Sequence, residues 1–445
     1  MYAYELPFKN TYTFSSLDEL DYAARKMGLS IPVSRDLSPL SRQPVIRTRA
    51  GEIRLKNSLT VHPMEGFDGG EDGSPSELSF RRYLRFARSG AALIWTEAIA
   101  VCPEGRTSDH QLMITEENKE RFRELVTEVK KVTDAPIIAQ LTHSGRFSHN
   151  SKTPYPIIAT HNEIIEAKRT GDKTVPLVSD EYLDTLPALY AKTAELLVWA
   201  GFDGVDIKAC HQYLLAEVLS AHTREGRYGG SFENRSRLLL DCARAVAKAV
   251  PDTTILGSRL GVYDALPYPW GFGAKRDGAD EPDFTEANAL IAELRKIGVS
   301  VVDMTMGTPY FNPHVNRPYN KGGYVADEHP LVGVNRLISG CREIVHANPD
   351  VAIIGTGYSY LREFAPYVAA GALDAGCATL IGFGRMAFAY EGFANDFIAG
   401  KIDPKKVCIS CSKCTEIMRA GGTTGCPIRD QEIYLPIYRK LCMKK

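Results

Sequence analysis

The chain has 445 residues, which is enough for one large α/β domain or two ordinary ones. Its composition is 44% hydrophobic and 24% charged with a net charge of −1, which gives no indication of a nucleic-acid or membrane partner. The first residues, MYAYELPFKNTYTF, lack a secretory signal pattern, and no apolar run approaches the roughly 18 residues of a membrane helix, so we expect a cytoplasmic protein with reduced cysteines.

Residues 1–50 are expected to form an N-terminal extension, in which SSLDELDYAARKMG (15–28) predicts a helix with Ser16 near its N-cap. Short runs rich in β-branched residues then alternate with amphipathic stretches, of which 117–132 and 285–298 are the clearest. The strand-like runs are 59–64, 92–99, 136–143, 204–209, 254–261, 300–305, 351–357 and 378–384. This alternation predicts an α/β fold, a closed (β/α)₈ TIM barrel over residues 51–400. A short C-terminal cysteine-rich lobe, 401–445, completes the chain.

The predicted strands turn polar at their C-terminal ends, where His143, Lys208, Arg259 and Thr305 lie. In barrels of this kind the C-terminal rim carries the chemistry, so these side chains are candidates for function. Two longer insertions, 144–180 and 306–334, interrupt the strand–helix pattern. The second is rich in Tyr, Pro, Gly and Asn, as a lid over the rim would be.

The stretch 200–241 contains the strongest catalytic candidates, in the sequence VDIKACHQYLL. A predicted strand ends at Lys208, and His211 and Tyr213 follow within six residues. A tyrosine can give a proton to a carbon centre, while a neighbouring His or Lys holds a carbonyl oxygen on which charge develops. We therefore predict that Lys208, His211 and Tyr213 act together.

The same stretch, with GFDGVDIK, HQYLL and YGGSFENR in order, resembles the signature of the Old Yellow Enzyme family. The resemblance extends over residues 50–400. It implies a flavin-dependent ene-reductase on a (β/α)₈ barrel with FMN at the C-terminal rim.

The resemblance also carries over a set of flavin-binding positions. The segment HPMEG implies Pro63, Met64 and Glu65 beside the reactive edge of the flavin, and AQLTHSGR implies Gln140 at the pyrimidine and His143 facing the site. Arg259 in GSRLG is implied near flavin N1 and O2. The segments GTG and GFGR are similar to the family's phosphate grip and supply Gly357, Gly384 and Arg385.

Two positions depart from the usual family pattern. Lys208 stands where a histidine often binds the substrate carbonyl, and Glu65 stands where a threonine or cysteine often adjusts the flavin potential. A fixed cation at 208 would suit a carboxylate, an enolate or the flavin itself. A carboxylate at 65 should alter the flavin potential unless it pairs with a cation such as Lys208. The departures therefore concern the substrate range.

Four cysteines, Cys408, Cys411, Cys414 and Cys426, follow the last barrel unit with the spacing Cys-x₂-Cys-x₂-Cys-x₁₁-Cys. Three cysteines at successive three-residue steps plus a distant fourth favour a [4Fe–4S] cluster, with structural zinc and free thiols as alternatives. The position is similar to that of the cluster in the iron–sulfur branch of the family, which includes 2,4-dienoyl-CoA reductase and trimethylamine dehydrogenase. No GxGxxG motif follows Cys426, so we expect no dinucleotide domain.

These features predict an FMN-dependent ene-reductase that reduces a C=C bond conjugated to a carbonyl or carboxyl group. Electrons would come from NAD(P)H at the rim or, as we favour, from a separate redox protein through the cluster. One alternative is amine oxidation, with Tyr310, Phe311, Tyr319 and Tyr324 as an aromatic cage. Another is a non-catalytic electron-transfer subunit. The sequence leaves the oligomeric state open, a homo-oligomer included.

Overall fold

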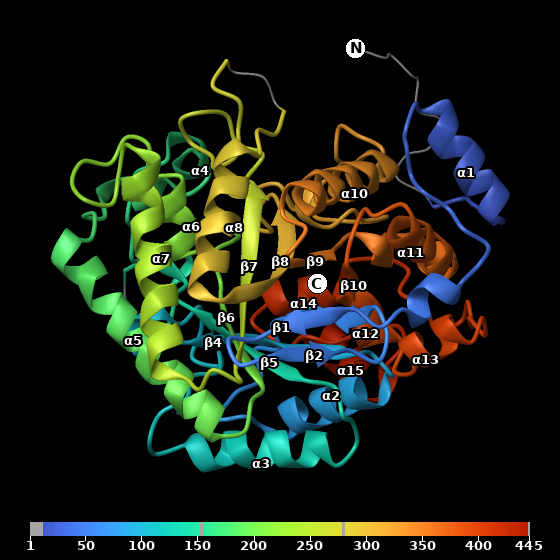
Figure 1. Ribbon diagram of the computed structural model, residues 1–445, viewed down its shortest axis with the longest axis horizontal. Coiled ribbons are helices and arrows are strands. Elements are labelled where there is room, and N and C mark those ends of the chain that lie inside the picture. Colours follow the sequence, from blue (N-terminus) through green and yellow to red (C-terminus); the bar gives the residue numbers. More distant parts are fainter. Residues whose placement is uncertain (1–11, 152, 154, 278–280, 444–445) are drawn as a thin grey trace.

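The computed structural model describes residues 12–443 apart from 152, 154 and 278–280, and it forms a closed barrel surrounded by helices (Figure 1). All neighbouring barrel strands pair in parallel. In barrel order the strands are β10 (Leu380–Phe383), β3 (Leu59–Val61), β4 (Leu93–Ala100), β5 (Ile137–Thr142), β6 (Gly204–Ile207), β7 (Ile255–Tyr263), β8 (Val299–Met306) and β9 (Ala352–Gly355). The predicted (β/α)₈ barrel is confirmed, and each predicted strand run overlaps one of these strands, of which β4, β7 and β8 extend one or two residues beyond the run.

An outer helix follows each barrel strand along the chain. These helices are α2 (Glu77–Arg88), α3 (Lys119–Lys130), α5 (Asp180–Trp199), α7 (Phe232–Ala249), α8 (Thr285–Ile297), α10 (Pro330–Ala347), α11 (Ala365–Asp374) and α13 (Phe393–Ile398). The stretches 117–132 and 285–298 become α3 and α8, whose apolar faces are buried against the barrel. Helix α8 ends at Gly298, whose φ of 112° is the left-handed conformation that a glycine C-cap supplies.

A two-stranded antiparallel hairpin, β1 (Val45–Arg47) and β2 (Glu52–Arg54), covers the N-terminal end of the barrel. Ile46 and Leu55 are buried there in one apolar cluster with Trp95, Ile138 and Val301 from the barrel strands. The opposite, C-terminal end is thereby left as the open end of the barrel. This arrangement places the polar strand ends where the sequence predicted the chemistry.

The extension before the hairpin runs along the outside of the barrel. Helix α1 (Leu17–Lys26) begins with Ser16, whose side chain accepts a hydrogen bond from the backbone N–H of Glu19, as the sequence predicted. Beyond α1, the N–H of Ser30 donates to Asn335 of α10 and that of Ser34 to the carbonyl of Tyr367 in α11. Among the described residues, none of the helices has the length and apolar character needed to span a bilayer.

Further helices occupy the insertions, the loops above the rim and the C-terminal lobe. They are α4 (Glu163–Glu166), α6 (Leu214–Leu219), α9 (Pro313–Asn316), α12 (Arg385–Ala389), α14 (Lys413–Arg419) and α15 (Gln431–Cys442). Helix α4 lies in the first insertion and α9 in the second, while α14 and α15 pack on each other around buried Ile417, Tyr434 and Tyr438. The first insertion, the second insertion and the lobe all meet above the barrel mouth.

Candidate active site at the barrel mouth

The turn between β6 and α6 positions the predicted catalytic residues. His211 and Gln212 both have positive φ, 66° and 58°, a conformation that costs free energy for residues other than glycine. The side chain of Gln212 holds this turn by donating from Nε2 to Oδ2 of Asp264, at 2.6 Å. Tyr213 then becomes the N-cap of α6. The strained turn therefore sets Lys208, His211 and Tyr213 close together at the end of β6.

Tyr213 is held by a cation and by a second tyrosine. Nζ of Lys208 lies 3.9 Å from the centroid of its ring, and its hydroxyl lies 2.8 Å from that of Tyr310 in the second insertion. The ring of Tyr310 stacks on Phe147 of the first insertion, with centroids 3.9 Å apart. Burial raises the pKa of Tyr213 well above its ordinary value. The phenol therefore keeps its proton at neutral pH and can donate it.

Lys208 also pairs with Glu65, the other residue that departs from the family pattern. Nζ of Lys208 lies 3.8 Å from Oε1 of Glu65, and both oxygens of Glu65 are buried without a hydrogen-bond partner among the described residues. Burial raises the pKa of Glu65 to about 7, although the Lys208 charge opposes this. Burial likewise lowers the pKa of Lys208. The two unusual residues thus form one weakly solvated pair at the mouth.

His211 is neutral and oriented by the second insertion. Nδ2 of Asn316 lies 3.1 Å from its Nε2 and 2.8 Å from Oγ1 of Thr305. Burial, with the charges of Arg259 and Lys208 adding to it, lowers the pKa of His211 well below its ordinary value. With Nε2 accepting from Asn316, the proton of the neutral ring lies on Nδ1. That N–H is available to donate to a substrate oxygen.

Arg259 joins β7 to the loop after β3. Its Nη1 donates to the carbonyl of Pro63 at 3.0 Å, and its Nε lies 3.1 Å from Oδ2 of Asp303. Asp303 is fully buried on β8, and Nδ1 of His62 lies 3.1 Å from its other oxygen. Sequence reasoning did not identify Asp303 or His62. A signal was present in the sequence: Asp303 lies inside the apolar run VVDMT. A buried acid needs a cationic partner, so this position could have indicated a nearby cation.

Gln140 is oriented by a buried acid of the neighbouring strand. Its Nε2 donates to Oδ2 of Asp206 at 2.5 Å, and Nε1 of Trp95 donates to the same oxygen at 2.9 Å. Oδ1 of Asp206 accepts from the backbone N–H of Arg259 at 2.6 Å. Burial raises the pKa of Asp206 to about 6. One carboxyl group therefore fixes both Gln140 and the strand that carries Arg259.

His143 makes its side-chain contacts toward the outer helix α5. The N–H of Gly145 donates to its Nδ1, at 3.1 Å, so its proton lies on Nε2, which is 2.8 Å from the hydroxyl of Tyr182. Ligand atoms of Cys102, Glu104 and His143 lie within 4.8 Å of one another. A metal ion at this group would need a free lone pair on Nε2 of His143. Because the N–H of Gly145 donates to Nδ1, the ring proton lies on Nε2 and occupies that position. The group is better described as a hydrogen-bonded cluster.

Gly357 and Gly384, two residues of the predicted phosphate grip, lie just after β9 and β10. The third, Arg385, extends its side chain toward the cysteines. A Cβ atom at Gly384 would lie 2.6 Å from Sδ of Met64, so the loops after β10 and β3 are in contact. Nη2 of Arg385 donates to the carbonyl of Pro318 at 2.7 Å. Arg385 also lines the cavity that contains the cysteine side chains.

Cys408, Cys411, Cys414 and Cys426 line that one enclosed cavity. Burial raises the pKa of the Cys426 thiol to about 12 and raises those of Cys411 and Cys414. Four cysteines around one cavity, one of them buried and three partly buried, fit a metal centre with sulfur ligands. In the described part of the chain, no three of these sulfurs lie within 4.8 Å of one another. A single tetrahedral ion with bonds of about 2.3 Å would bring its sulfurs closer than that, to about 3.8 Å.

The cysteine-rich lobe is attached directly to the loop that carries Glu65. Arg81 of α2 forms two hydrogen bonds with Asp430, of 2.7 and 2.8 Å, and the N–H of Thr424 donates to the carbonyl of Gly66 at 2.7 Å. Thr424 is two residues from Cys426, and Gly66 is next to Glu65. The cysteine cavity and the predicted flavin edge are therefore adjacent in the fold.

A cavity of about 830 Å³ lies on the outer side of Tyr310, between the first insertion and the lobe. Its lining includes Phe147, Arg169, Tyr310 and Arg419, so the Tyr310–Phe147 stack separates it from Tyr213. The four aromatic residues proposed as a cage do not gather around it. Tyr319 packs on Tyr324, and Phe311 lies under Nζ of Lys168 at 4.1 Å.

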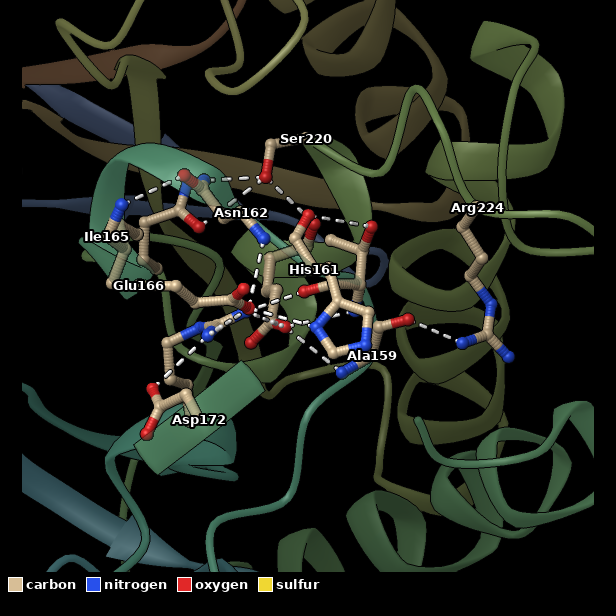
Figure 2. A network of polar contacts seen from close by, with 12 residues as sticks. Ala159, His161, Asn162, Ile165, Glu166, Asp172, Ser220 and Arg224 are labelled. Carbon is tan, nitrogen blue, oxygen red and sulfur yellow. Dashed lines mark hydrogen bonds and ion pairs between the residues drawn. The ribbon is translucent and has the colours of Figure 1, made fainter. Parts of the chain in front are cut away.

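The first insertion is fixed to α6 by a buried charge network (Figure 2). Arg146 has no exposed side-chain surface and lies 3.1 Å from Glu166, 3.2 Å from Asp172 and 3.1 Å from Glu217 of α6. In Figure 2, His161, Glu166 and Asp172 of the insertion gather at this point. Since α6 follows Tyr213 directly, the network also fixes the catalytic turn.

The sequence matches the family model described as the NADH:flavin oxidoreductase / NADH oxidase family over residues 48–389. The chain belongs to this family. It is therefore a flavin-dependent oxidoreductase, and FMN is its family's cofactor, as the resemblance implied. Unpaired buried atoms at the mouth, including both oxygens of Glu65, fit a polar cofactor there.

The "metal reductase" of Desulforamulus reducens is 28% identical over 373 residues, which cover 82% of this chain and 50% of that protein. The chain thus spans half the length of this relative. A solved complex of 2-naphthoyl-CoA reductase has a TM-score of 0.69 at 16% identity, covering 88% of this chain and 57% of that one. Old Yellow Enzyme from Pichia sp. AKU4542 has a TM-score of 0.62 at 22% identity, covering 82% and 88% of the two chains. These structures share the fold.

Proposed function

We propose that the chain is an FMN-dependent ene-reductase that reduces a C=C bond conjugated to a carbonyl or carboxyl group. The observation that carries this proposal is the position of Tyr213, buried between the ammonium of Lys208 and the hydroxyl of Tyr310 beside Glu65. A protonated phenol next to fixed donors is what protonation of a carbon centre requires.

FMN would be held by the loop Pro63–Glu65, by Gln140 and Arg259, by the loops at Gly357 and Gly384, and by Arg385, while the ring of His143 contacts Tyr182 of α5. When bound, it supplies a hydride from N5 to the β-carbon of the substrate. Arg259, anchored by Asp303, would balance negative charge on the flavin ring. Gln140, oriented by Asp206, would bind the pyrimidine amide.

The substrate oxygen would be bound by Nζ of Lys208 and Nδ1 of His211. As negative charge develops on this oxygen, both groups stabilise it in a site that is largely closed to water. Tyr213 then gives its proton to the α-carbon. The Lys208 cation over the ring stabilises the phenolate that remains, until a proton from solvent restores the phenol.

We further propose that Cys408, Cys411, Cys414 and Cys426 bind a [4Fe–4S] cluster. Their shared cavity and the three-residue steps from Cys408 to Cys414 support a cluster over a single zinc ion. Such a cluster passes single electrons, and the contact between Thr424 and Gly66 supports transfer between the lobe and the flavin edge. The electrons would come from an external redox protein or from NAD(P)H at the rim.

The test is anaerobic mixing of photoreduced protein with enones, enoates, enoyl-CoA and aroyl-CoA thioesters, followed by flavin absorbance. We expect at least one class to reoxidise the flavin, and Tyr213→Phe to slow this step by about a hundredfold or more. The matched control, Tyr324→Phe, removes a hydroxyl that contacts Nδ1 of His314 within the second insertion. If no acceptor reoxidises the flavin, the ene-reductase assignment is wrong. Bleaching of oxidised flavin by added amines would instead indicate amine oxidation.

A further inference from the structure

Two arginine side chains lie beside the cysteine cavity. Arg317 follows α9 in the second insertion, and Arg385 is the first residue of α12. Arg385 lines the cavity of the four cysteines, Arg317 lines a neighbouring cavity with Ser412 and Thr415, and the two positive charges repel each other. Arg385 is buried, and Arg317 is partly buried.

Neither guanidinium forms an ion pair with an acid among the described residues. Nη1 of Arg317 donates to Oγ1 of Thr415, and its Nε is buried without a partner. Nη2 of Arg385 donates to the carbonyl of Pro318, while its Nη1 is buried without a partner. Glu416 lines a small cavity with Arg317, but Oε2 of Glu416 accepts from the hydroxyl of Tyr438 at 2.7 Å.

Two like charges in a weakly solvated place are costly unless an anion compensates them. The chain offers two anion sites within reach, the four cysteines and the proposed phosphate grip at Gly384 and Arg385. The side-chain partner of Arg317 is Thr415, which is adjacent to Cys414 in sequence and lies on the cysteine side. Bound as thiolates to a cluster, the cysteines would supply net negative charge next to Arg317.

We propose that Arg317 is a counter-cation of the iron–sulfur cluster and raises its reduction potential. Arg317 is a positioning residue in this role, because it acts on the cluster through space and touches no reacting atom. The inference rests on the cluster assigned under the proposed function. It also gives the second insertion a task beyond covering the mouth, since the residue that tunes the cluster and Tyr310, which contacts the proton donor, belong to one segment.

The experiment is a redox titration of the purified protein followed by electron paramagnetic resonance, with iron, sulfide and flavin contents measured in parallel. Arg317→Gln should shift the reduced-to-oxidised ratio of the cluster about tenfold toward the oxidised form at a fixed potential, which is about 59 mV for a one-electron couple. Arg317→Lys should restore most of the shift. The control, Arg419→Gln, removes an exposed arginine of the same lobe and should have little effect because solvent screens its charge.

An unchanged titration in Arg317→Gln would overturn the inference. So would weaker FMN binding with an unchanged cluster titration, since that result assigns the guanidinium to the phosphate. If the glutamine variant holds no iron, Arg317→Lys must hold it, and loss from both variants indicates a structural role instead. Absence of iron and sulfide from the native protein would overturn the cluster itself. The ene-reductase proposal is tested separately, because the flavin reoxidation assay does not depend on iron.

Discussion

The chemistry of Tyr213 depends on residues that are distant in sequence. Lys208 comes from the same turn, but Tyr310 is 97 residues further along the chain and reaches Tyr213 only because the second insertion folds back over the mouth. In the proposed mechanism the ammonium would stabilise the phenolate after proton transfer, and Tyr310, which also lines the outer cavity, contacts the phenol hydroxyl. We therefore propose that Tyr213 is the proton donor and that Tyr310 lies on the route of its reprotonation.

Asp264 supports the catalytic turn and should make stability depend on pH. Its Oδ2 accepts from Gln212 and from the N–H of Phe272, and burial raises the pKa of Asp264 to about 7. A raised pKa means that the folded state prefers the protonated acid. The contribution of Asp264 to the free energy of unfolding is therefore complete near pH 4 and is lost as pH rises through about 7. Asp264→Asn cannot ionise and should escape this loss.

Urea denaturation of both proteins between pH 4.5 and 8 measures this effect. Relative to Asp264→Asn, the native protein should lose at most about 4 kcal/mol of unfolding free energy across that range, with most of the change below pH 7. Comparing the two proteins cancels the other titrating groups. A difference that does not vary with pH would contradict the raised pKa.

At the scale of single residues, the sequence identified the side chains that lie next to one another along the chain. Lys208, His211 and Tyr213 share one turn, so their proximity could be predicted from spacing. The sequence also named Lys208 as a cation that could pair with Glu65, because both residues depart from the family pattern, and the two side chains are in contact. Asp303 and Asn316 were not identified, and Tyr310 was named only as part of an aromatic cage, since their contacts with Arg259, His211 and Tyr213 are tertiary and no local pattern encodes them.

At the scale of elements, the first insertion acts as a brace for the catalytic turn. It contains little regular structure, yet Arg146 joins it to Glu217 of α6 and to its own Glu166 and Asp172. Three carboxylates share this one buried cation, and Glu217 has no other ion-pair partner among the described residues, whereas Asp172 also pairs with Arg169. Hydrophobic periodicity predicted the strands and the outer helices, but it could not predict this brace, whose stability comes from buried charge.

Arg146→Met should destabilise the protein by about 3–5 kcal/mol, because it leaves buried carboxylates without their cation. We also expect residues 144–180 to become the first site of limited proteolysis, and flavin reoxidation by the substrate to slow through disorder of the turn at Tyr213. Chemical denaturation and peptide mapping test these effects. The control, Arg25→Met, removes an exposed arginine paired with Asp21 on α1 and should cost less than about 1 kcal/mol. Equal effects of the two substitutions would contradict the brace.

At the scale of the whole molecule, the barrel and the cysteine-rich lobe have different sources of stability. The barrel closes through parallel strand pairing and a continuous apolar core. The lobe has only a small apolar cluster of its own, and its four cysteines line one cavity instead of adding to that cluster. The repeat of strand and helix predicted the barrel well, and the cysteine spacing predicted that the four thiols converge. The attachment of the lobe through Arg81 and Thr424 could not be predicted, since neither residue belongs to a motif.

This difference in stability leads to a prediction for Cys426→Ser. The variant should lose most of its iron, and residues 401–443 should exchange amide hydrogens faster, because metal binding supplies much of the folding free energy of a lobe with so small a core. The barrel strands should stay protected and FMN should remain bound, since strand pairing does not involve the lobe. Iron and flavin analysis with hydrogen-exchange mass spectrometry measures both effects. Cys442→Ser is the matched control, because Cys442 lies on α15 outside the cysteine cavity and its loss should leave iron unchanged. Full iron retention in Cys426→Ser would exclude Cys426 as a ligand, and simultaneous unfolding of the barrel would show that the lobe and the barrel are one cooperative unit.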